Sequence, residues 1–264
     1  MSGNNIVTVG AHQTSYGGGG DDSFIAKFDI NGLRLWSTYY GGNQIEWGQS
    51  CAVANDGSAY LVGYTYSSDG IASGGSYQST FGGGIDAFIA KFNSSGVRQW
   101  GTYFGSTGPE MAYSCSLDQV SGSLYICGHV SADGIASPGA YQTLLSGGSN
   151  TDAFLAKFSS SGFRQWCTLY GGTDLEYGLS CKYKSSSNIV YLVGTTRSNA
   201  AISTAGVHQT TYSGFFDAFL VGFNSSGSRQ WATYYGGSSS TYGYGCSFSN
   251  DAIYVSGYTT MEHQ

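Results

Sequence analysis

Short runs of apolar and small residues recur along this chain in a fixed order. A run of the form Asp-x-Phe-x-x-x-Phe occurs four times, at intervals of 64, 66 and 65 residues. Its copies begin at Asp22, Asp86, Asp152 and Asp217. Each copy leads through a short glycine-containing turn into a second run that starts with Arg-x-Trp. Two β-prone runs joined by such a turn predict a β-hairpin.

Two further runs complete each repeat. The third run is centred on a cysteine, at Cys51, Cys115, Cys181 and Cys246. The fourth contains a tyrosine followed three residues later by glycine, at Tyr60, Tyr125, Tyr191 and Tyr254. A long polar segment of 23, 24 and 23 residues then leads from that glycine to the next Asp-x-Phe run. Each repeat therefore predicts four short antiparallel strands, and the whole chain predicts an all-β fold with almost no helix.

The two ends of the chain predict how the repeats are arranged. The chain begins inside a long polar segment, because Val9–Thr14 matches Ala205–Thr210, and it stops shortly after a fourth run. The first two strands would thus complete a blade that the last two strands begin. This 2+2 strand closure leaves no bare sheet edge. We expect one domain over residues 1–264, a four-bladed β-propeller of four-stranded antiparallel blades. Two chains that exchange end strands in an eight-bladed ring are the alternative.

Several motifs together carry a resemblance to a known family. The elements Asp-Ala-Phe-Ile-Ala-Lys-Phe, Thr-Tyr-Tyr-Gly-Gly and Tyr-Leu-Val-Gly-Tyr-Thr, with Pro138–Gln142 before the next Asp, resemble the SBBP-type β-propeller repeat over nearly the whole chain. The resemblance implies a propeller without shared catalytic residues, in a secreted or cell-surface protein. By similarity to related propellers, the cysteine strand is innermost, followed by the Tyr-Gly, Asp-x-Phe and Arg-x-Trp strands. The long loops and the outer-to-inner connections then share one face.

Composition excludes some classes of partner. Charged residues make up 10% of the chain and the formal net charge is −6, with only ten Lys and Arg. No basic stripe is present to neutralise phosphates, so we expect neither nucleic acid nor membrane insertion. The 42 glycines fit a fold rich in tight turns. The compartment stays open: six free cysteines and the lack of a signal peptide favour the cytoplasm, whereas the resemblance implies a surface location.

The four cysteines in register invite a metal or disulfide interpretation. The residues two positions away on each side are mostly large, as at Gln49, Tyr113 and Tyr183, so period-two alternation places the cysteines on the packed face between blades. We therefore favour core packing over metal binding. Cys127 and Cys167 fall on the second and fourth strands of one blade, which are not neighbours, so a disulfide between them is geometrically difficult.

A recurring acidic position gives the best candidate site. Five residues before each cysteine stand Glu46, Glu110 and Glu176, with Thr241 in the fourth repeat. Three carboxylates around a narrow axis repel one another unless they hold a cation such as Ca²⁺, take up a proton or meet a cationic ligand. No cofactor is otherwise required. The alternative is that they are solvated loop acids or partners for backbone amides. With the neighbouring aromatic residues, the candidate ligand-binding residues are Glu46, Trp47, Glu110, Glu176, Tyr177, Thr241 and Tyr242.

Other repeated residues look structural, and we assign no catalytic residue. An Asp that opens a strand can accept backbone hydrogen bonds from the preceding loop, and a Gln recurs before each one, at Gln13, Gln78, Gln142 and Gln209. No Ser-His-Asp arrangement or metal-like histidine spacing is present.

Three classes of function remain. The leading hypothesis is a non-catalytic binding module that recognises glycans, as a multivalent lectin-like protein, or proteins, through the face that bears the long loops. The second is a structural or self-assembling homo-oligomer, suggested by low charge and 22 tyrosines. The third is a metal-dependent enzyme at the mouth of the axial channel, with Glu46, Glu110 and Glu176 as its acidic groups.

Overall fold

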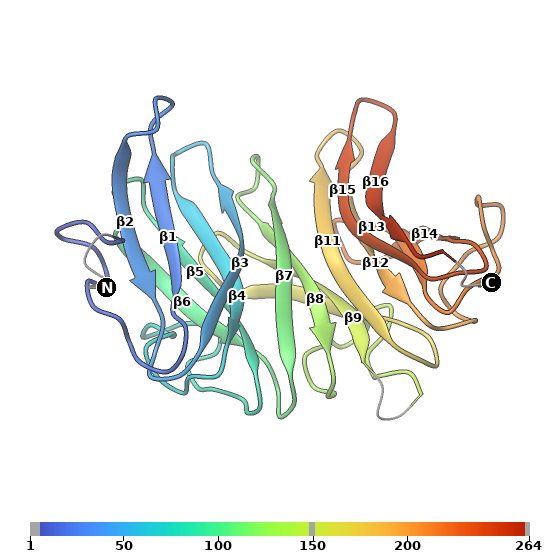
Figure 1. The fold of residues 1–264 in the computed structure, drawn as a ribbon, viewed down its shortest axis with the longest axis horizontal. Coiled ribbons are helices and arrows are strands. Elements are labelled where there is room, and N and C mark those ends of the chain that lie inside the picture. Colours follow the sequence, from blue (N-terminus) through green and yellow to red (C-terminus); the bar gives the residue numbers. More distant parts are fainter. Residues whose placement is uncertain (1–5, 148–150, 262–264) are drawn as a thin grey trace. The chain divides into compact units, whose positions relative to one another are not determined.

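The computed structural model describes residues 6–147 and 151–261, which contain sixteen strands (Figure 1). Three four-stranded sheets and two two-stranded sheets account for all of these strands. Within the described ranges no helix combines the length and apolar composition needed to cross a membrane. The predicted all-β fold, built from four-stranded antiparallel blades, is therefore confirmed.

The strand bounds follow the predicted repeat. The first complete sheet consists of β3 (Glu46–Val53), β4 (Ala59–Thr65), β5 (Asp86–Phe92) and β6 (Arg98–Phe104). The second consists of β7 (Glu110–Leu117), β8 (Leu124–Val130), β9 (Asp152–Phe158) and β10 (Arg164–Tyr170). The third consists of β11 (Glu176–Lys184), β12 (Ile189–Thr196), β13 (Asp217–Asn224) and β14 (Arg229–Tyr235). The two-stranded sheets are β1 (Ser23–Phe28) with β2 (Arg34–Tyr40), and β15 (Thr241–Phe248) with β16 (Ile253–Thr259).

Strand order within each complete sheet is the predicted one. The cysteine strand lies at one edge, followed by the Tyr-Gly strand, the Asp-x-Phe strand and, at the other edge, the Arg-x-Trp strand. In the first sheet, for example, β4 pairs with β5 from Ala59↔Phe92 to Thr65↔Asp86. The two two-stranded sheets are separate in the hydrogen-bonding pattern. Closure of the fourth blade therefore stays a prediction.

The chain separates into two compact units. Unit 1 contains the residues up to Ala112 together with Ser161–Phe163, and unit 2 contains the rest. Unit 1 holds the β1–β2 sheet and the first complete sheet, and unit 2 holds the third complete sheet and the β15–β16 sheet.

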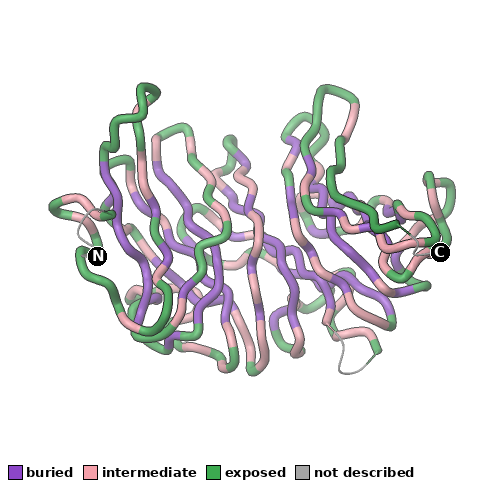
Figure 2. Tube along the Cα trace, viewed as in Figure 1, coloured by how far each residue is buried: buried purple, intermediate pink, exposed green. Residues whose placement is uncertain are grey.

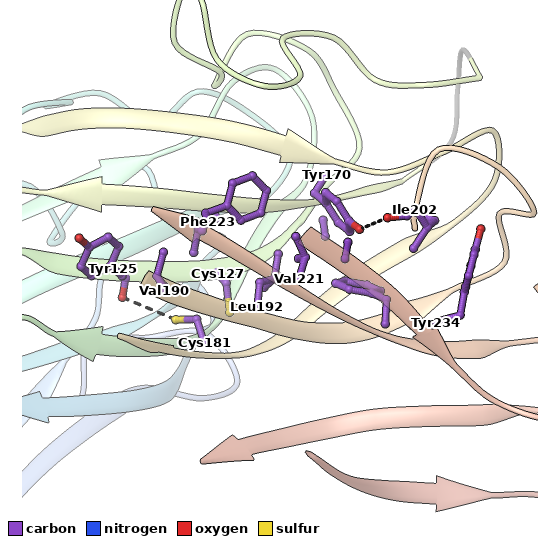
Figure 3. Packing of buried hydrophobic residues seen from close by; sticks show 14 residues of the cluster. Tyr125, Cys127, Tyr170, Cys181, Val190, Leu192, Ile202, Val221, Phe223 and Tyr234 are labelled. Atoms are coloured by element: carbon purple, nitrogen blue, oxygen red, sulfur yellow. Dashed lines mark hydrogen bonds between the residues drawn. The ribbon is translucent and has the colours of Figure 1, made fainter. Parts of the chain in front are cut away.

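The core of unit 2 is formed by large side chains from several strands (Figure 3). Two of its polar groups are satisfied within the core: the Tyr170 hydroxyl donates to the Ile202 carbonyl at 2.6 Å, and the Cys181 thiol donates to the Tyr125 carbonyl at 3.8 Å. Cys127 on β8 and Cys167 on β10 are separated by β9, as predicted, and all six cysteines are free.

Core packing of the register cysteines is confirmed for three of the four. Cys115, Cys181 and Cys246 are buried, but Cys51 is exposed. The reason is that Cys181 packs under the first two strands of the preceding sheet, at Ser114 and Tyr125. The sheet that precedes β3 in the chain, β1–β2, lacks the two strands that would supply this cover.

The alternation predicted for the cysteine strand is interrupted by a β-bulge. The register with the neighbouring strand shifts between Gly48 and Ser50, and again between Gly243 and Gly245. An extra residue at such a point changes the phase of the side chains. Gln49 and Tyr244, which strict alternation places on the packed face, are consequently exposed.

Strands β1 and β16 of the two-stranded sheets are more exposed than their counterparts in the complete sheets (Figure 2). All seven residues of β4 are buried, whereas in the equivalent β16 one is intermediate and the rest are exposed. Phe24 and Phe28 on β1 are 58% and 57% exposed, whereas the equivalent Phe88 and Phe92 on β5 are fully buried. Each two-stranded sheet thus presents an apolar edge whose counterpart in the complete sheets is covered by a strand.

Candidate functional site

A glutamine and an aspartate fasten the long loop to the sheet in every repeat. In the repeat of Asp86, Oδ2 accepts hydrogen bonds from Gln78 Nε2 at 2.9 Å and from the Gly82 amide at 2.8 Å. Gln78 Oε1 in turn accepts from the Gly105 amide at 3.0 Å. The same contacts join Gln13 to Asp22, Gln142 to Asp152 and Gln209 to Asp217. These contacts agree with a structural role for both residues.

The three candidate glutamates are each held inside their own repeat. Glu46 Oε1 accepts from Thr65 Oγ1 at 2.6 Å, and its Oε2 accepts from the Gly42 amide at 2.9 Å. Glu176 has the same partners, Thr196 and Gly172. Glu110 accepts from the hydroxyl and the amide of Ser106, at 2.6 and 2.8 Å. All three residues are buried, so they are not solvated loop acids. Their hydrogen bonds match the alternative that they are partners for backbone amides.

Each glutamate lies beside the aspartate that opens a strand of the preceding hairpin. A Cβ atom on Gly105 would lie 2.5 Å from Asp86 Oδ1 and 2.8 Å from Glu110 Oε2, so both oxygens approach one point. Gly171 makes the same approach to Asp152 Oδ1 and Glu176 Oε2, and Gly41 to Asp22 and Glu46. The sequence did not predict these pairs. A constant spacing of 24 residues between each Asp and its Glu was the available signal.

Burial shifts the titration of these carboxyls. The pKa of Glu110 and Glu176 is raised to about 7, chiefly by desolvation and also by the neighbouring aspartate, against the hydrogen bonds that lower it. Desolvation likewise raises the pKa of Asp86 and Asp152 to about 6. The pKa values of Asp22 and Glu46 are also raised, chiefly by burial.

The structure does not identify these glutamates as metal ligands. Among the described residues, no group of three or more His, Cys, Asp or Glu side chains is placed to hold a metal ion. Each glutamate has both oxygens engaged by N–H or O–H donors of its own repeat. Calcium at the predicted axial site therefore stays a prediction.

The aromatic candidates lie at the surface beside two equivalent hollows. Glu46 and Trp47 line a hollow of about 410 Å³, where Trp47 is 43% exposed and donates from Nε1 to Asp21 Oδ2 at 3.0 Å. Thr241 and Tyr242 line a hollow of about 370 Å³ in the fourth repeat. The Tyr242 ring stacks on Tyr258 with ring centroids 4.7 Å apart.

Tyr177, the equivalent of Trp47 in the third repeat, packs edge to face on His129 at 5.0 Å. The three candidate aromatic residues thus occupy one position of the repeat, next to a buried Glu or Thr. The structure brings together Glu46 with Trp47 and Thr241 with Tyr242, each pair within its own repeat.

Two grooves were missed by the sequence reasoning. One of about 370 Å³ is lined by Tyr141, Trp166 and Arg229, and the Arg229 guanidinium lies 4.5 Å from the centre of the Tyr141 ring. The other, of similar volume, is lined by Lys27 and Trp36. Both combine the Arg-x-Trp strand of one repeat with the Ser-Gly turn of the next. The sequence contains both motifs but gives no sign that they meet.

Comparison with known proteins gives one distant relative. No protein-family model matches the chain. The chain is similar to an uncharacterized WD repeat-containing protein of Acanthamoeba polyphaga mimivirus, with 24% identity over 258 residues. The alignment covers 81% of this chain and 18% of the relative, so the chain spans less than a fifth of that protein's length. The similarity agrees with a β-propeller repeat architecture.

Proposed function

We propose that this chain is a non-catalytic binding module that recognises a protein partner through the aromatic position at the start of the cysteine strands. The observation that carries the proposal is the pairing of a partly exposed aromatic ring with a surface hollow, at Trp47 and again at Tyr242. Aromatic side chains in such positions contribute much of the energy of protein interfaces. The buried carboxyls beneath them are engaged in hydrogen bonds and are not arranged as a nucleophile with its base.

The similarity to a WD repeat-containing protein supports a binding or scaffold role over a catalytic one. Repetition adds to this argument, because two equivalent sites on one chain increase the avidity for a partner with repeated epitopes.

Glycan recognition is the second candidate. Aromatic rings beside small polar residues also suit sugars, and Gly48, Gln49 and Ser23 line the hollow at Trp47. We rank it second because Trp47 already donates its indole N–H to Asp21, which leaves the ring face as its main contribution.

The test uses the purified chain in two screens. A displayed peptide library is selected against the chain, and the affinity of a selected peptide is measured by calorimetry for wild type, Trp47→Ala and Tyr242→Ala. Phe163→Ala, which truncates an exposed aromatic residue in the β9–β10 turn, is the control. We expect about tenfold weaker binding for the two site variants and no change for the control.

A glycan array run in parallel separates the two candidates. Signal on the array that is lost in Trp47→Ala, without any selected peptide, would replace the protein-binding proposal by the lectin-like one. Equal affinity of all variants for a selected peptide would place its binding elsewhere and contradict the proposal.

A further inference from the structure

Three buried carboxyl pairs in this protein share one hydrogen-bonding pattern. In Asp86–Glu110 and Asp152–Glu176 both residues are fully buried, and Asp22–Glu46 repeats the arrangement with a partly exposed Asp22. In each pair, Asp Oδ2 and both glutamate oxygens accept hydrogen bonds from N–H or O–H donors. Asp Oδ1 is buried without any hydrogen-bond partner in all three. This same oxygen and Glu Oε2 both lie within 3.2 Å of the place that a Cβ atom on the shared glycine would take.

An orphan acceptor at the same atom of three repeats indicates a missing donor. Leaving a buried polar atom unsatisfied costs about 1–3 kcal/mol, and more when the group is charged. The charge of each aspartate also raises the pKa of its neighbouring glutamate, because two carboxylates repel each other in a medium of low dielectric constant. The pairs therefore need a positively charged occupant.

No side chain supplies that charge. The ion pair in the described residues joins Arg197 to Asp174 and involves none of the six carboxyls. The groups that face the pairs are neutral or acidic. Tyr103 faces Asp86, Tyr212 and Tyr234 face Glu176, and Asp133 faces Asp152. Tyr16 faces Asp22 and Glu46, and Tyr40 and Tyr103 face Glu46. Burial raises the pKa of these tyrosines, so they stay uncharged near neutral pH.

We propose that each of the three pairs is a proton-binding site, in which one proton is shared between Glu Oε2 and Asp Oδ1. The proton becomes the donor that Oδ1 lacks and removes one of the two negative charges. A calcium ion fits less well, because Ca²⁺ takes 6–8 oxygen ligands and the other three oxygens of each pair already accept hydrogen bonds. One pair takes up one proton from solvent as a carboxylate becomes a carboxylic acid, with no other change of bonding.

The fourth repeat is a built-in control. Thr241 stands where the other repeats have Glu, so a single carboxyl, Asp217, is left there. The Ser213 hydroxyl lies between its two oxygens, 3.4 Å from Oδ1 and 3.2 Å from Oδ2, so Oδ1 has a long shared contact that the other three aspartates lack. The repeat without the glutamate is thus also the repeat in which a hydroxyl lies near the aspartate Oδ1.

The carboxyl pairs bind a proton more tightly in the folded protein than in the unfolded chain, and this fixes how the folding stability changes with pH. The carboxyl pKa values are raised on folding to about 6 and 7 in the two fully buried pairs. The stabilisation is therefore complete at low pH and is lost as pH rises through that range. Because the two groups of a pair are coupled, the titration belongs to the pair and not to either residue.

The experiment compares melting temperatures between about pH 5 and about pH 8.5, a range that spans these titrations. For wild type we expect the melting temperature to fall by several degrees as pH rises through 6 to 7. Glu110→Gln with Glu176→Gln should flatten this fall, because a glutamine side chain does not take up a proton in this pH range. Thr241→Glu should make the fall steeper by creating a fourth pair.

A second measurement does not depend on any variant folding. Carbon-13 NMR of the carboxyl groups in wild type should show Glu110 and Glu176 still protonated at pH 6. Ordinary titration of these groups below pH 5 would overturn the proposal. So would a rise in melting temperature at pH 8 on adding Ca²⁺ that EDTA reverses, since a metal ion would then be the occupant.

Discussion

The indole N–H of Trp36 on β2 donates a hydrogen bond to the carbonyl oxygen of Ser94, in the β5–β6 turn, at 3.0 Å. Trp166 on β10 makes the same bond to Ser225, at 2.9 Å. The glycine of each turn packs against the indole ring. A Cβ atom on Gly96 would come within 2.7 Å of Trp36 Cδ2. The Arg-x-Trp motif of one repeat and the Ser-Gly turn of the next therefore form a single contact.

Replacing Trp166 by Phe should destabilise the protein by about 1–2 kcal/mol. The substitution keeps an aromatic ring against Gly227 but removes the indole donor, which leaves the Ser225 carbonyl with only the longer bond from Lys157 Nζ, at 3.4 Å. The free energy of unfolding from urea denaturation checks this. Gln165→Ala, at the exposed neighbouring position, should change it by less than about 0.5 kcal/mol.

Trp231 occupies the same position of the repeat as Trp36 and Trp166. In a closed ring it would contact the turn that contains Gly32, the equivalent of Gly96 and Gly227. A Cβ atom added to Gly32 would meet nothing within 4 Å, in contrast to Gly96 and Gly227. If the β1–β2 and β15–β16 sheets join as the sequence predicts, Trp231→Phe should cost as much as Trp166→Phe. A cost near zero in the same denaturation experiment would contradict closure.

Amide hydrogen exchange tests the same closure at the strand edge. In a closed blade β16 occupies the place that β4 and β12 have in their sheets, so its amides should exchange as slowly as theirs. Peptides covering β16 and β12 can be compared by mass spectrometry in one sample. Fast exchange limited to β16 would show a free edge, and native mass spectrometry would show whether slow exchange comes from a second copy.

The sequence was sufficient for the repeat, which follows from periodicity. The strand order, and with it the separation of Cys127 from Cys167, was predicted from the similarity to related propellers. The sequence was insufficient wherever packing depends on a neighbouring repeat. The exposure of Cys51 depends on which strands cover it, and the bulges at Gln49 and Tyr244 change side-chain phase without changing strand length. Glu110 was singled out as a candidate site residue, but its neighbour Asp86 was interpreted separately, since their approach at Gly105 is a tertiary contact.

Gly171 should not tolerate a side chain. A Cβ atom there would overlap Asp152 Oδ1 and lie 2.5 Å from Glu176 Oε2, and both carboxyls are fixed by hydrogen bonds. We expect Gly171→Ala to cost about 1–3 kcal/mol through overpacking, measured by thermal unfolding. Gly237→Ala is the matched control, because its added Cβ meets nothing within 4 Å. Equal melting temperatures for the two variants would show that the carboxyl pair can move apart.

His129 on β8 should remain neutral well below the usual range of histidine. It is 8% exposed, lies between the rings of Tyr113 and Tyr177, and its Nδ1 has no hydrogen-bond partner. Desolvation lowers its pKa to about 4. Because folding favours the neutral ring, its contribution to stability is present above the unfolded pKa of about 6.5 and is lost as pH falls toward 4.

This pKa difference of His129 makes the folded protein about 2 kcal/mol less stable at pH 5 than at pH 8. Proton NMR of the imidazole should therefore show no titration of His129 above about pH 5, and His129→Phe should gain stability over wild type as the solution is acidified. This trend is opposite in sign to that of the carboxyl pairs, so the two partly offset each other in wild type. His129→Phe removes the histidine contribution and leaves the fall with rising pH that the carboxyl pairs cause. A midpoint near 6.5 for His129 would show that its ring reaches solvent.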